Sequence, residues 1–213
     1  MHGKTVTIYG GSGFIGRYIT KELAELGAII RVGVRHLHEA SFLKPMGSVA
    51  QITPIFVDIN NQNSVDESAK NADILINCVG ILTESGNAQF DSIHHKGAQY
   101  IAEAAQKWNV ERLIHFSALG ANPNSASHYA LTKALGEQAV LKAFPAATIL
   151  RPSIVFGPED NFFNRFAALA QMSFFIPLIG GGHTKFQPVY VSDIAHFVAS
   201  VLQNKACQSA IYE

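Results

Sequence analysis

The chain has 213 residues, with 16 basic and 16 acidic side chains and a formal charge of zero. This balance argues against a general nucleic-acid binder, because such a protein needs an excess of basic residues to displace counterions from phosphate. Hydrophobic residues make up 48% of the sequence and charged residues 15%, which supplies enough apolar material for a core and argues against disorder. The sequence has no signal-peptide pattern, no run of the roughly 20 apolar residues that a membrane span needs, and only two cysteines, so a reducing compartment is expected.

Short β-type runs alternate with longer helical stretches along the chain. The β-type runs lie at residues 5–9, 29–34, 52–57, 74–76, 112–116 and 148–150. The helical stretches lie at residues 14–26, 64–69, 89–108 and 128–144. Strands that are apolar on both faces and separated by helices form parallel sheets covered on both sides. The sequence therefore predicts an α/β fold, a Rossmann-type doubly wound parallel sheet with right-handed crossovers.

A glycine-rich loop joins the first predicted strand to the first predicted helix. Gly11, Gly13 and Gly16 fit the pattern G-x-G-x-x-G, and Gly10 with the last two fits G-x-x-G-x-x-G. Glycine allows the tight turn, the approach of the backbone to a pyrophosphate and close packing of helix on strand, while the helix N-terminus stabilises the phosphate charge. Glycines that merely punctuate a turn are the alternative, but the position between strand and helix favours dinucleotide binding. The predicted cofactor-binding residues here are Gly10, Gly11, Ser12, Gly13, Phe14, Ile15, Gly16 and Arg17.

The end of the second strand bears on the choice of cofactor. An acidic residue about 20 positions after the glycine loop would bind the ribose 2′-hydroxyl of NAD, but the first acid in this region is Glu39. Arg35 stands at the strand end instead, and its guanidinium can form charged hydrogen bonds to a 2′-phosphate, which Arg17 could also reach. A solvated strand-end charge is the alternative role for Arg35. The sequence therefore predicts NADP(H) in preference to NAD(H), and NAD(H) binding stays open.

Further cofactor contacts are expected at the carboxyl ends of the third and fourth strands, where the crevice of such a sheet lies. Asp58 could accept a hydrogen bond from the adenine amino group or cap the following turn, and the two roles are compatible. We interpret Cys78 as a small buried apolar residue, because nothing nearby in the sequence would activate its thiol. The predicted cofactor-binding residues of these strand ends are Asp58, Ile59, Asn77, Cys78, Val79 and Gly80.

Tyr129 and Lys133 are the candidates for acid/base chemistry. They stand at positions i and i+4 of a predicted helix, so the phenol and the ammonium can point into one crevice. The lysine charge, together with an oxidised nicotinamide, is expected to lower the pKa of the tyrosine, which could then exchange a proton with a substrate oxygen. Ser117, at the end of the preceding strand, could hydrogen-bond the same oxygen. An exposed surface pair is the alternative, and the place after a strand-end serine in a dinucleotide fold argues against it.

These features resemble the short-chain dehydrogenase/reductase superfamily, in its extended or atypical, epimerase/dehydratase-like branch, over essentially the entire chain. The resemblance implies catalytic roles for Ser117, Tyr129 and Lys133. It implies that residues 150–158 pass near the nicotinamide and that residues 188–195 form a strand and a capped helix. It also implies that residues 157–188 contribute to a small substrate lobe, incomplete in this chain, and that residues 209–213 begin a further strand. The cofactor contacts that it adds are Pro152, Ser153, Ile154 and Val155.

Within the superfamily, the chain looks most like the nucleotide-binding accessory subunit of respiratory complex I and its bacterial relatives. Arg35 and residues 156–164 suggest this subgroup, for which the resemblance implies NADPH binding. Its mitochondrial members look like structural cofactor binders rather than enzymes, and the intact Tyr129/Lys133 pair departs from them. Two functions are therefore open: an NADP(H)-binding oxidoreductase or epimerase-like enzyme, and a non-catalytic NADPH-binding structural or assembly protein.

The expected partners follow from these two functions. An enzyme would take a small molecule, apolar or nucleotide-linked, while the resemblance implies association with a respiratory complex in the mitochondrial matrix, or a cytoplasmic place in a bacterium. The phenylalanine-rich region at residues 162–175 is expected to form the core of a small lobe. An apolar substrate pocket and contact with a membrane surface are the alternatives.

The nine histidines do not predict a metal site. His36 and His38, and likewise His94 and His95, are near neighbours, but neither pair falls into a zinc pattern with cysteine or acid. We interpret them as scattered residues of helices and loops. His183 lies in a glycine-rich loop that could close over a substrate, with an ordinary surface turn as the alternative.

Overall fold

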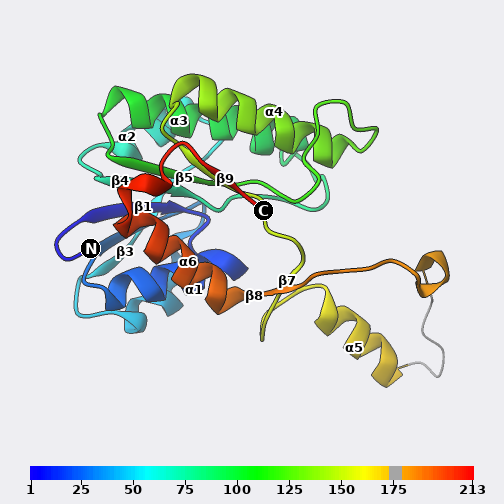
Figure 1. The fold of residues 1–213 in the computed structure, drawn as a ribbon. Coiled ribbons are helices and arrows are strands. Elements are labelled where there is room, and N and C mark those ends of the chain that lie inside the picture. Colours follow the sequence, from blue (N-terminus) through cyan, green and yellow to red (C-terminus); the bar gives the residue numbers. More distant parts are fainter. Residues whose placement is uncertain (173–178) are drawn as a thin grey trace.

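A parallel sheet of seven strands forms the centre of the protein in the computed structural model, which describes residues 1–172 and 179–213 (Figure 1). The strands run in the order β3-β2-β1-β4-β5-β6-β9, and every neighbouring pair is parallel. This doubly wound order places a ligand crevice at the carboxyl ends of β1 and β4, where the direction of winding reverses. It confirms the predicted fold class. The strand bounds are β1 Thr5–Tyr9, β2 Ile29–Val34, β3 Ile52–Phe56, β4 Ile74–Asn77, β5 Arg112–Phe116, β6 Thr148–Leu150 and β9 Ile211–Tyr212.

Helices cover both faces of this sheet. On one face, α1 (Phe14–Glu25) packs against α6 (Val191–Gln203). On the other face, α2 (Gln62–Ala69), α3 (Gly97–Lys107) and α4 (His128–Ala143) lie in a row (Figure 1). The two helical layers shield both faces of the strands from water, as a parallel sheet requires.

Strand β1 shows how the two apolar layers arise. Its side chains alternate between the faces of the sheet, so Val6 and Ile8 belong to the layer beneath α1 and α6. Tyr9 belongs to the layer beneath the other three helices. Its hydroxyl shares a hydrogen bond of 2.9 Å with the Ser68 hydroxyl, which satisfies the only polar atom of this buried ring.

The observed elements differ from the predicted ones in two places within the Rossmann core. A 3₁₀ segment, η1 (Leu37–Met46), follows β2 where no element is predicted. The helix predicted over residues 89–108 begins as a π-helical turn, η2 (Asp91–Lys96), and continues as α3. Apolar periodicity does not separate these cases, because it reports which face is buried and not whether the backbone bonds run to i+4 or i+5.

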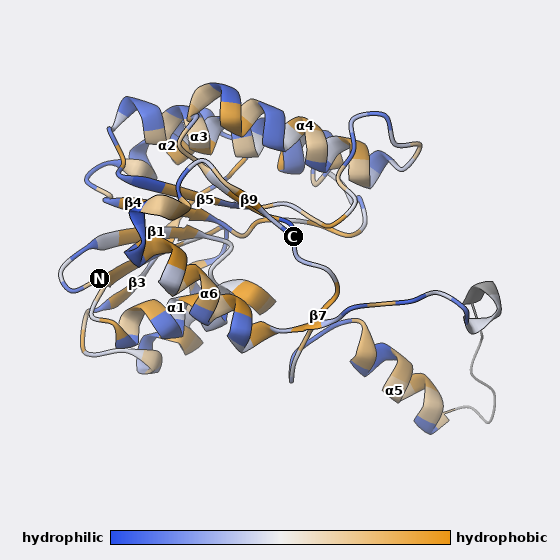
Figure 2. Cartoon of the chain, viewed as in Figure 1, coloured by the Kyte–Doolittle hydropathy of each residue, from blue (hydrophilic) through white to orange (hydrophobic). Residues whose placement is uncertain are grey.

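The segment between β6 and α6 leaves the sheet and returns to it. Its two ends pair in parallel as β7 (Val155–Phe156) and β8 (Val189–Tyr190). Between them, α5 (Phe163–Met172) extends away from the sheet (Figures 1 and 2), and the short 3₁₀ turn η3 (Ile179–Gly182) follows. A last 3₁₀ turn, η4 (Lys205–Cys207), leads from α6 into β9.

The prediction of a phenylalanine core in this region is wrong for the described residues. Asp160 begins α5 by accepting hydrogen bonds from the amides of Phe162 and Phe163, at 2.9 and 2.6 Å. No residue of α5 is buried, and Phe163 is 41% exposed. An amphipathic helix needs a second surface to bury its apolar face, and the described elements meet this face only at single rings, such as Phe156 of β7 at 6.1 Å from Phe163. Phe174 and Phe175 lie outside the described residues.

A largely buried ion pair ties α4 to the end of β6. The Arg151 guanidinium donates to both carboxylate oxygens of Glu137, at 2.9 and 2.7 Å, and to Glu213 at 2.6 Å. The Glu137 side chain is only 5% exposed. We expect Glu137→Ala to lower the free energy of unfolding by about 3 kcal/mol in urea titrations, because removal of one partner leaves a partly buried charge.

Glu213→Gln is the matched control for this prediction. Its carboxylate contacts the same guanidinium but is half exposed, so we expect a cost below about 1 kcal/mol. Equal losses in the two variants would contradict the importance of the buried pair. The double variant Glu137→Leu/Arg151→Met, which replaces both charges by apolar groups, is expected to recover much of the lost stability.

Candidate cofactor and active site

A cleft with a volume of about 1120 Å³ opens at the crevice that the strand order predicts. It brings together predicted residues from distant segments: Gly10, Gly13, Phe14, Ile15, Gly16, Cys78, Gly80, Ser117, Tyr129, Lys133, Pro152, Ser153, Ile154 and Val155. The other predicted residues do not line this cleft, and they are Gly11, Ser12, Arg17, Arg35, Asp58, Ile59, Asn77 and Val79. Cofactor binding by either group stays a prediction.

The glycine loop is held in a conformation that side chains would prevent. Gly10 has a φ of +73°, and a Cβ on Gly16 would lie 2.3 Å from the Gly10 carbonyl oxygen. The first turn of α1 therefore sits directly on the loop. Among the described residues no side chain caps α1, and its first residues line the cleft. Open amides at a helix N-terminus fit the pyrophosphate of a dinucleotide.

The two arginines predicted to reach a 2′-phosphate lie in different environments. Arg35 is exposed and forms no ion pair within the described part of the chain, whereas the Arg17 guanidinium lies 3.7 Å from the Glu159 carboxylate. The Arg17 guanidinium donates to the carbonyl oxygens of Ser12 and Gly13 at 3.2 and 3.3 Å and lies 4.9 Å from the centre of the Phe42 ring. Arg35 is thus the more accessible of the two for an anion.

The remaining predicted contacts interact with other groups of the protein near the ends of β3 and β4. The Asp58 carboxylate accepts a hydrogen bond from the Asn60 amide at 3.0 Å, which is the turn role considered from the sequence. Ile59 is buried and packs against α3. The Asn77 side chain accepts from the Val79 amide at 3.0 Å and lies 3.1 Å from Nδ1 of His115.

Cys78 is half-buried at the cleft, and His115 is fully buried beside Asn77. Burial raises the pKa of the Cys78 thiol, which fits the interpretation of this residue as a small apolar side chain. Burial, followed by the charge of Lys133, lowers the pKa of His115 to about 3. The imidazole of His115 is therefore neutral at pH 7.

Lys133 and Ser117 lie at the floor of the cleft, where they are 4% and 5% exposed. The Lys133 ammonium donates to the Phe116 carbonyl at 3.1 Å. Burial lowers the pKa of Lys133 to about 8, against the opposing charge of Glu137. The Ser117 hydroxyl has no hydrogen-bond partner among the described residues. A buried hydroxyl that faces a cleft in this way can bond to water or to a ligand in the cleft.

Tyr129 lies in the first turn of α4. Ser127 caps this helix by accepting a hydrogen bond from the Ala130 amide at 3.4 Å. Burial raises the pKa of Tyr129, which is opposite to the shift expected from Lys133 and an oxidised nicotinamide. The spacing of Tyr129 and Lys133 indicates a neighbouring charge but not the loss of water around the phenol. Tyr129 is therefore protonated at neutral pH in the protein alone, as a proton donor requires.

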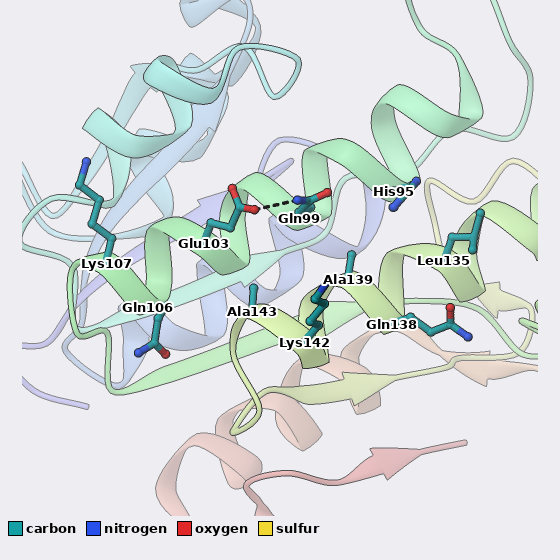
Figure 3. A pocket seen from close by; sticks show the side chains of 10 residues that line it. All are labelled: His95, Gln99, Glu103, Gln106, Lys107, Leu135, Gln138, Ala139, Lys142 and Ala143. Atoms are coloured by element: carbon teal, nitrogen blue, oxygen red, sulfur yellow. Dashed lines mark hydrogen bonds between the residues drawn. The ribbon is translucent and has the colours of Figure 1, made fainter.

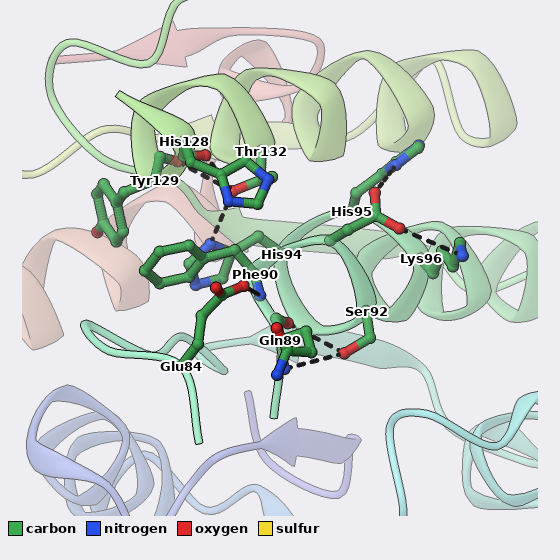
Figure 4. Close-up of polar contacts among 11 residues, drawn as sticks. Glu84, Gln89, Phe90, Ser92, His94, His95, Lys96, His128, Tyr129 and Thr132 are labelled. Atoms are coloured by element: carbon green, nitrogen blue, oxygen red, sulfur yellow. Dashed lines mark hydrogen bonds and ion pairs between the residues drawn. The ribbon is translucent and has the colours of Figure 1, made fainter. Parts of the chain in front are cut away.

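Phe162 lines the cleft, in line with the apolar pocket considered as an alternative for this region. The lining residues that the sequence did not indicate are Ile81, Leu82, Phe116, Ala118, Leu119, Asn161, Arg165, Lys185, Phe186 and Gln187. The phenylalanine content and the glycine-rich loop at residues 180–182 pointed to this region, but His183, which drew attention in that loop, does not line the cleft. No sequence pattern indicates a role for His94, which packs against Tyr129 in the structure (Figure 4).

A second hollow of about 610 Å³ lies between α3 and α4, on the outer face of these helices (Figure 3). Its lining is mainly polar or small and includes none of the predicted site residues. Over residues 1–172 and 179–213, no group of three or more histidine, cysteine or acidic side chains is arranged to hold a metal ion. Within the same ranges, no helix is long and apolar enough to cross a membrane.

Three comparisons place the chain among known proteins. The family model described as NAD dependent epimerase/dehydratase family matches residues 6–212. The chain is 37% identical over 204 residues to NADH dehydrogenase (ubiquinone) 1 alpha subcomplex subunit 9, mitochondrial, of Arabidopsis thaliana, covering 95% of this chain and 51% of that protein. It is 33% identical over 156 residues to the ceramide reductase of Caulobacter vibrioides, covering 73% and 48%. The chain thus spans about half the length of these relatives.

Solved structures share the fold. The enzyme WbmH of Bordetella bronchiseptica, in complex with NAD⁺, superposes with a TM-score of 0.75 at 18% identity, over 95% of this chain and 73% of that one. At this identity the likeness concerns the fold alone.

Proposed function

Since the chain belongs to the NAD-dependent epimerase/dehydratase family, we propose that it binds NADP(H) in the cleft and transfers hydride between the nicotinamide and a substrate carbon. The observation that carries this proposal is the unsatisfied hydroxyl of Ser117, which lines the same cleft as Tyr129, Lys133 and the glycine loop. A structural cofactor binder has no need to bury such a group beside a tyrosine–lysine pair.

The proposed chemistry in the reducing direction assigns one role to each residue. The bound cofactor supplies the hydride. Tyr129 donates its proton to the carbonyl oxygen of the substrate, and Ser117 donates a hydrogen bond to the same oxygen as charge develops on it. Lys133 holds positive charge beside the tyrosinate that remains, which favours the loss of the proton. In the oxidising direction the same groups accept the proton from a hydroxyl.

We further propose that the substrate carries an apolar portion. Phe162 and Phe186 line the cleft with their rings 5.7 Å apart, and Leu82 from the opposite side is largely exposed. The Caulobacter relative is named for the reduction of a ceramide, which combines a carbonyl group with long alkyl chains. Arg165 and Lys185 add positive charge at the same end of the cleft.

Transfer of a labelled hydride tests this function. The protein would be incubated with NADPH deuterated at both C4 positions and with a panel of long-chain ketones, ceramide-like compounds that carry a ketone, quinones and nucleotide-sugars. The expected result is one deuterium in a reduced product, detected by mass spectrometry. NADPH that stays unoxidised across the panel, with no difference between the wild type and Tyr129→Phe, would favour the second function below.

The second candidate is a non-catalytic NADPH-binding structural or assembly protein. It is supported by the 37% identity to a protein named as a subunit of mitochondrial NADH dehydrogenase. Under this proposal the chain associates with a respiratory complex, in the mitochondrial matrix or at the cytoplasmic side of a bacterial membrane. Bound NADPH would stabilise the native state by mass action, so a rise in melting temperature with NADPH fits both candidates and labelled hydride separates them.

The preference for NADP(H) rests on Arg35. We expect Arg35→Ala to weaken NADPH binding by roughly 10- to 100-fold, which is the range for charge-assisted hydrogen bonds to a phosphate, and to leave NADH binding unchanged. Fluorescence titration of both reduced cofactors measures this. Lys21→Ala, which removes an exposed charge from α1, is the control for general electrostatics. Equal or tighter binding of NADH by the wild type would contradict the preference.

A further inference from the structure

His94 is buried at the junction of three segments that build the active site. It lies in the π-helical turn η2 and is 1% exposed (Figure 4). Nε2 of its ring accepts a hydrogen bond from the Ile81 amide at 3.1 Å, and Nδ1 lies 3.3 Å from the Thr132 hydroxyl oxygen. Ile81 belongs to the wall of the cleft, and Thr132 lies in α4 between the two residues of the tyrosine–lysine pair.

The hydrogen bonds assign the tautomer of this ring. A backbone amide only donates, so Nε2 must carry a lone pair and the proton of the neutral ring must lie on Nδ1. The Thr132 hydroxyl donates its own proton to the carbonyl oxygen of His128 or Tyr129, at 2.9 or 3.1 Å, so its oxygen is free to accept from Nδ1. Burial, followed by the charge of Lys133, lowers the pKa of His94 to about 3, which agrees with a neutral ring.

The ring also packs against the tyrosine itself. The Tyr129 ring stands at 87° to the imidazole with its centre 5.3 Å away, and Phe90 stacks on the imidazole at 5.2 Å. Phe90 and Tyr129 meet edge to face at 5.7 Å, so the three rings form one cluster. A tyrosine packed on two sides in this way has fewer orientations available to its hydroxyl.

The wall that His94 holds is close to the lysine. A Cβ on Gly80 would lie 3.2 Å from the Lys133 ammonium and 3.9 Å from Nε2 of His94. Gly80, Ile81 and Leu82 line the cleft and His94 does not, so the ring contacts the cleft wall without lining the cleft. If the bond from Ile81 to His94 were lost, this wall would be free to move relative to α4.

We propose that His94 is a positioning residue, whose neutral Nδ1–H imidazole clamps the cleft wall at Ile81 to the first turns of α4 and orients Tyr129. The inference rests on the proposed function in assigning a role to Tyr129, but the clamp itself acts on cofactor binding whether or not turnover occurs. A catalytic role is not implied, because His94 does not line the cleft.

Three substitutions separate the parts of the clamp. His94→Gln places a carbonyl oxygen where Nε2 stands and can accept from the Ile81 amide. His94→Asn reaches only the position of Nδ1 and can donate to Thr132, but it leaves Ile81 unpaired. His94→Phe keeps a ring and loses both hydrogen bonds. His95→Gln is the matched control, since His95 lies in the same turn but is partly exposed and contacts Asp91.

Fluorescence titration with NADPH is the first readout. We expect His94→Phe and His94→Asn to weaken NADPH binding by about tenfold, the effect of one buried hydrogen bond, and His94→Gln to remain within about threefold of the wild type. A general loss of packing would weaken NADPH binding in both the Gln and the Asn variant, and not in the Asn variant alone. Wild-type affinity in the Phe variant, or equal losses in the Gln and Asn variants, would overturn the proposal.

Nitrogen NMR of the wild-type protein, labelled at histidine, is the second readout and does not require the variants to fold. The His94 signals, assigned by their absence in His94→Gln or by contacts to Tyr129, should show a protonated Nδ1 and a bare Nε2 at pH 7. An Nε2–H tautomer or a charged ring would overturn the clamp. If wild-type NADPH binding is absent, the proposed function fails and the tautomer still decides the role of His94.

Discussion

Tyr129→Phe is expected to lower the rate of hydride transfer by about 10²- to 10⁴-fold, the usual contribution of a positioned proton donor. The phenol is partly buried, it is protonated at neutral pH, and it lines the same cleft as Ser117 and Lys133. The variant keeps the ring that packs on Phe90 and His94, so the cluster should stay in place. Single-turnover oxidation of NADPH, followed at 340 nm with a substrate from the labelled-hydride panel, measures the loss.

NADPH affinity tells a catalytic loss from a structural one. We expect Tyr129→Phe to bind NADPH within about threefold of the wild type, because the substitution removes one hydroxyl and no packing. Tyr100→Phe, a partly buried tyrosine of α3 outside the cleft, is the matched control and should keep full activity. A Tyr129→Phe variant that turns over at the wild-type rate would remove the proposed proton donor.

Gly136→Ala is expected to lower the free energy of unfolding by at least about 4 kcal/mol, or to prevent folding. A Cβ at this position would lie 2.0 Å from the carbonyl oxygen of His94, so the backbone of α4 or of η2 must shift. Costs of this size arise where a substitution forces backbone and not a flexible side chain to move. Urea unfolding followed by circular dichroism measures the change.

Gly120→Ala separates the steric cost from the conformational one. Gly120 has a φ of +81°, and nothing lies within 4 Å of the position of its Cβ. Alanine at this position is expected to lower the free energy of unfolding by about 1 kcal/mol, because only the left-handed backbone is unfavourable for it. If the Gly136→Ala protein is as stable as the Gly120→Ala protein, α4 and η2 are not in close contact at this position. Soluble Gly136→Ala protein would also be expected to bind NADPH more weakly, since η2 carries His94.

The fold follows from local signals that agree with one another. The strand bounds of β1, β2 and β5 are predicted to the residue, because each is a short β-type run that ends before a glycine or a polar residue, at Gly10, Arg35 and Ser117. The π-helical turn could not be predicted in this way. The turn contains His94, whose carbonyl group is closely approached by Gly136 of α4. Gly136 lies 40 positions after Lys96, the last residue of the turn, so no local pattern reports this contact.

The candidate site divides in the same way. The glycine spacing indicates the loop before α1, and the i, i+4 spacing indicates Tyr129 and Lys133 of α4. Residues of both groups line the cleft. His94 gives no such signal, because its role depends on an amide of one segment and a hydroxyl of another. The raised pKa of Tyr129 was also missed, since the spacing to Lys133 says nothing about how much water the fold removes from the phenol.

The parallel pairing of β7 with β8, called the clasp below, has a consequence for how the substrate-facing wall of such proteins could vary. Val155 pairs with Val189 and Phe156 with Tyr190, so the departing and returning chain are fixed to each other before and after the excursion that carries α5. Closing a longer loop costs only about 0.6 kcal/mol for each doubling of its length. Residues inserted or exchanged beyond the clasp would therefore change the outer wall of the cleft at little cost to the sheet. The glycine loop, the lysine and the tyrosine could in this way be inherited unchanged while the wall facing the substrate is rebuilt.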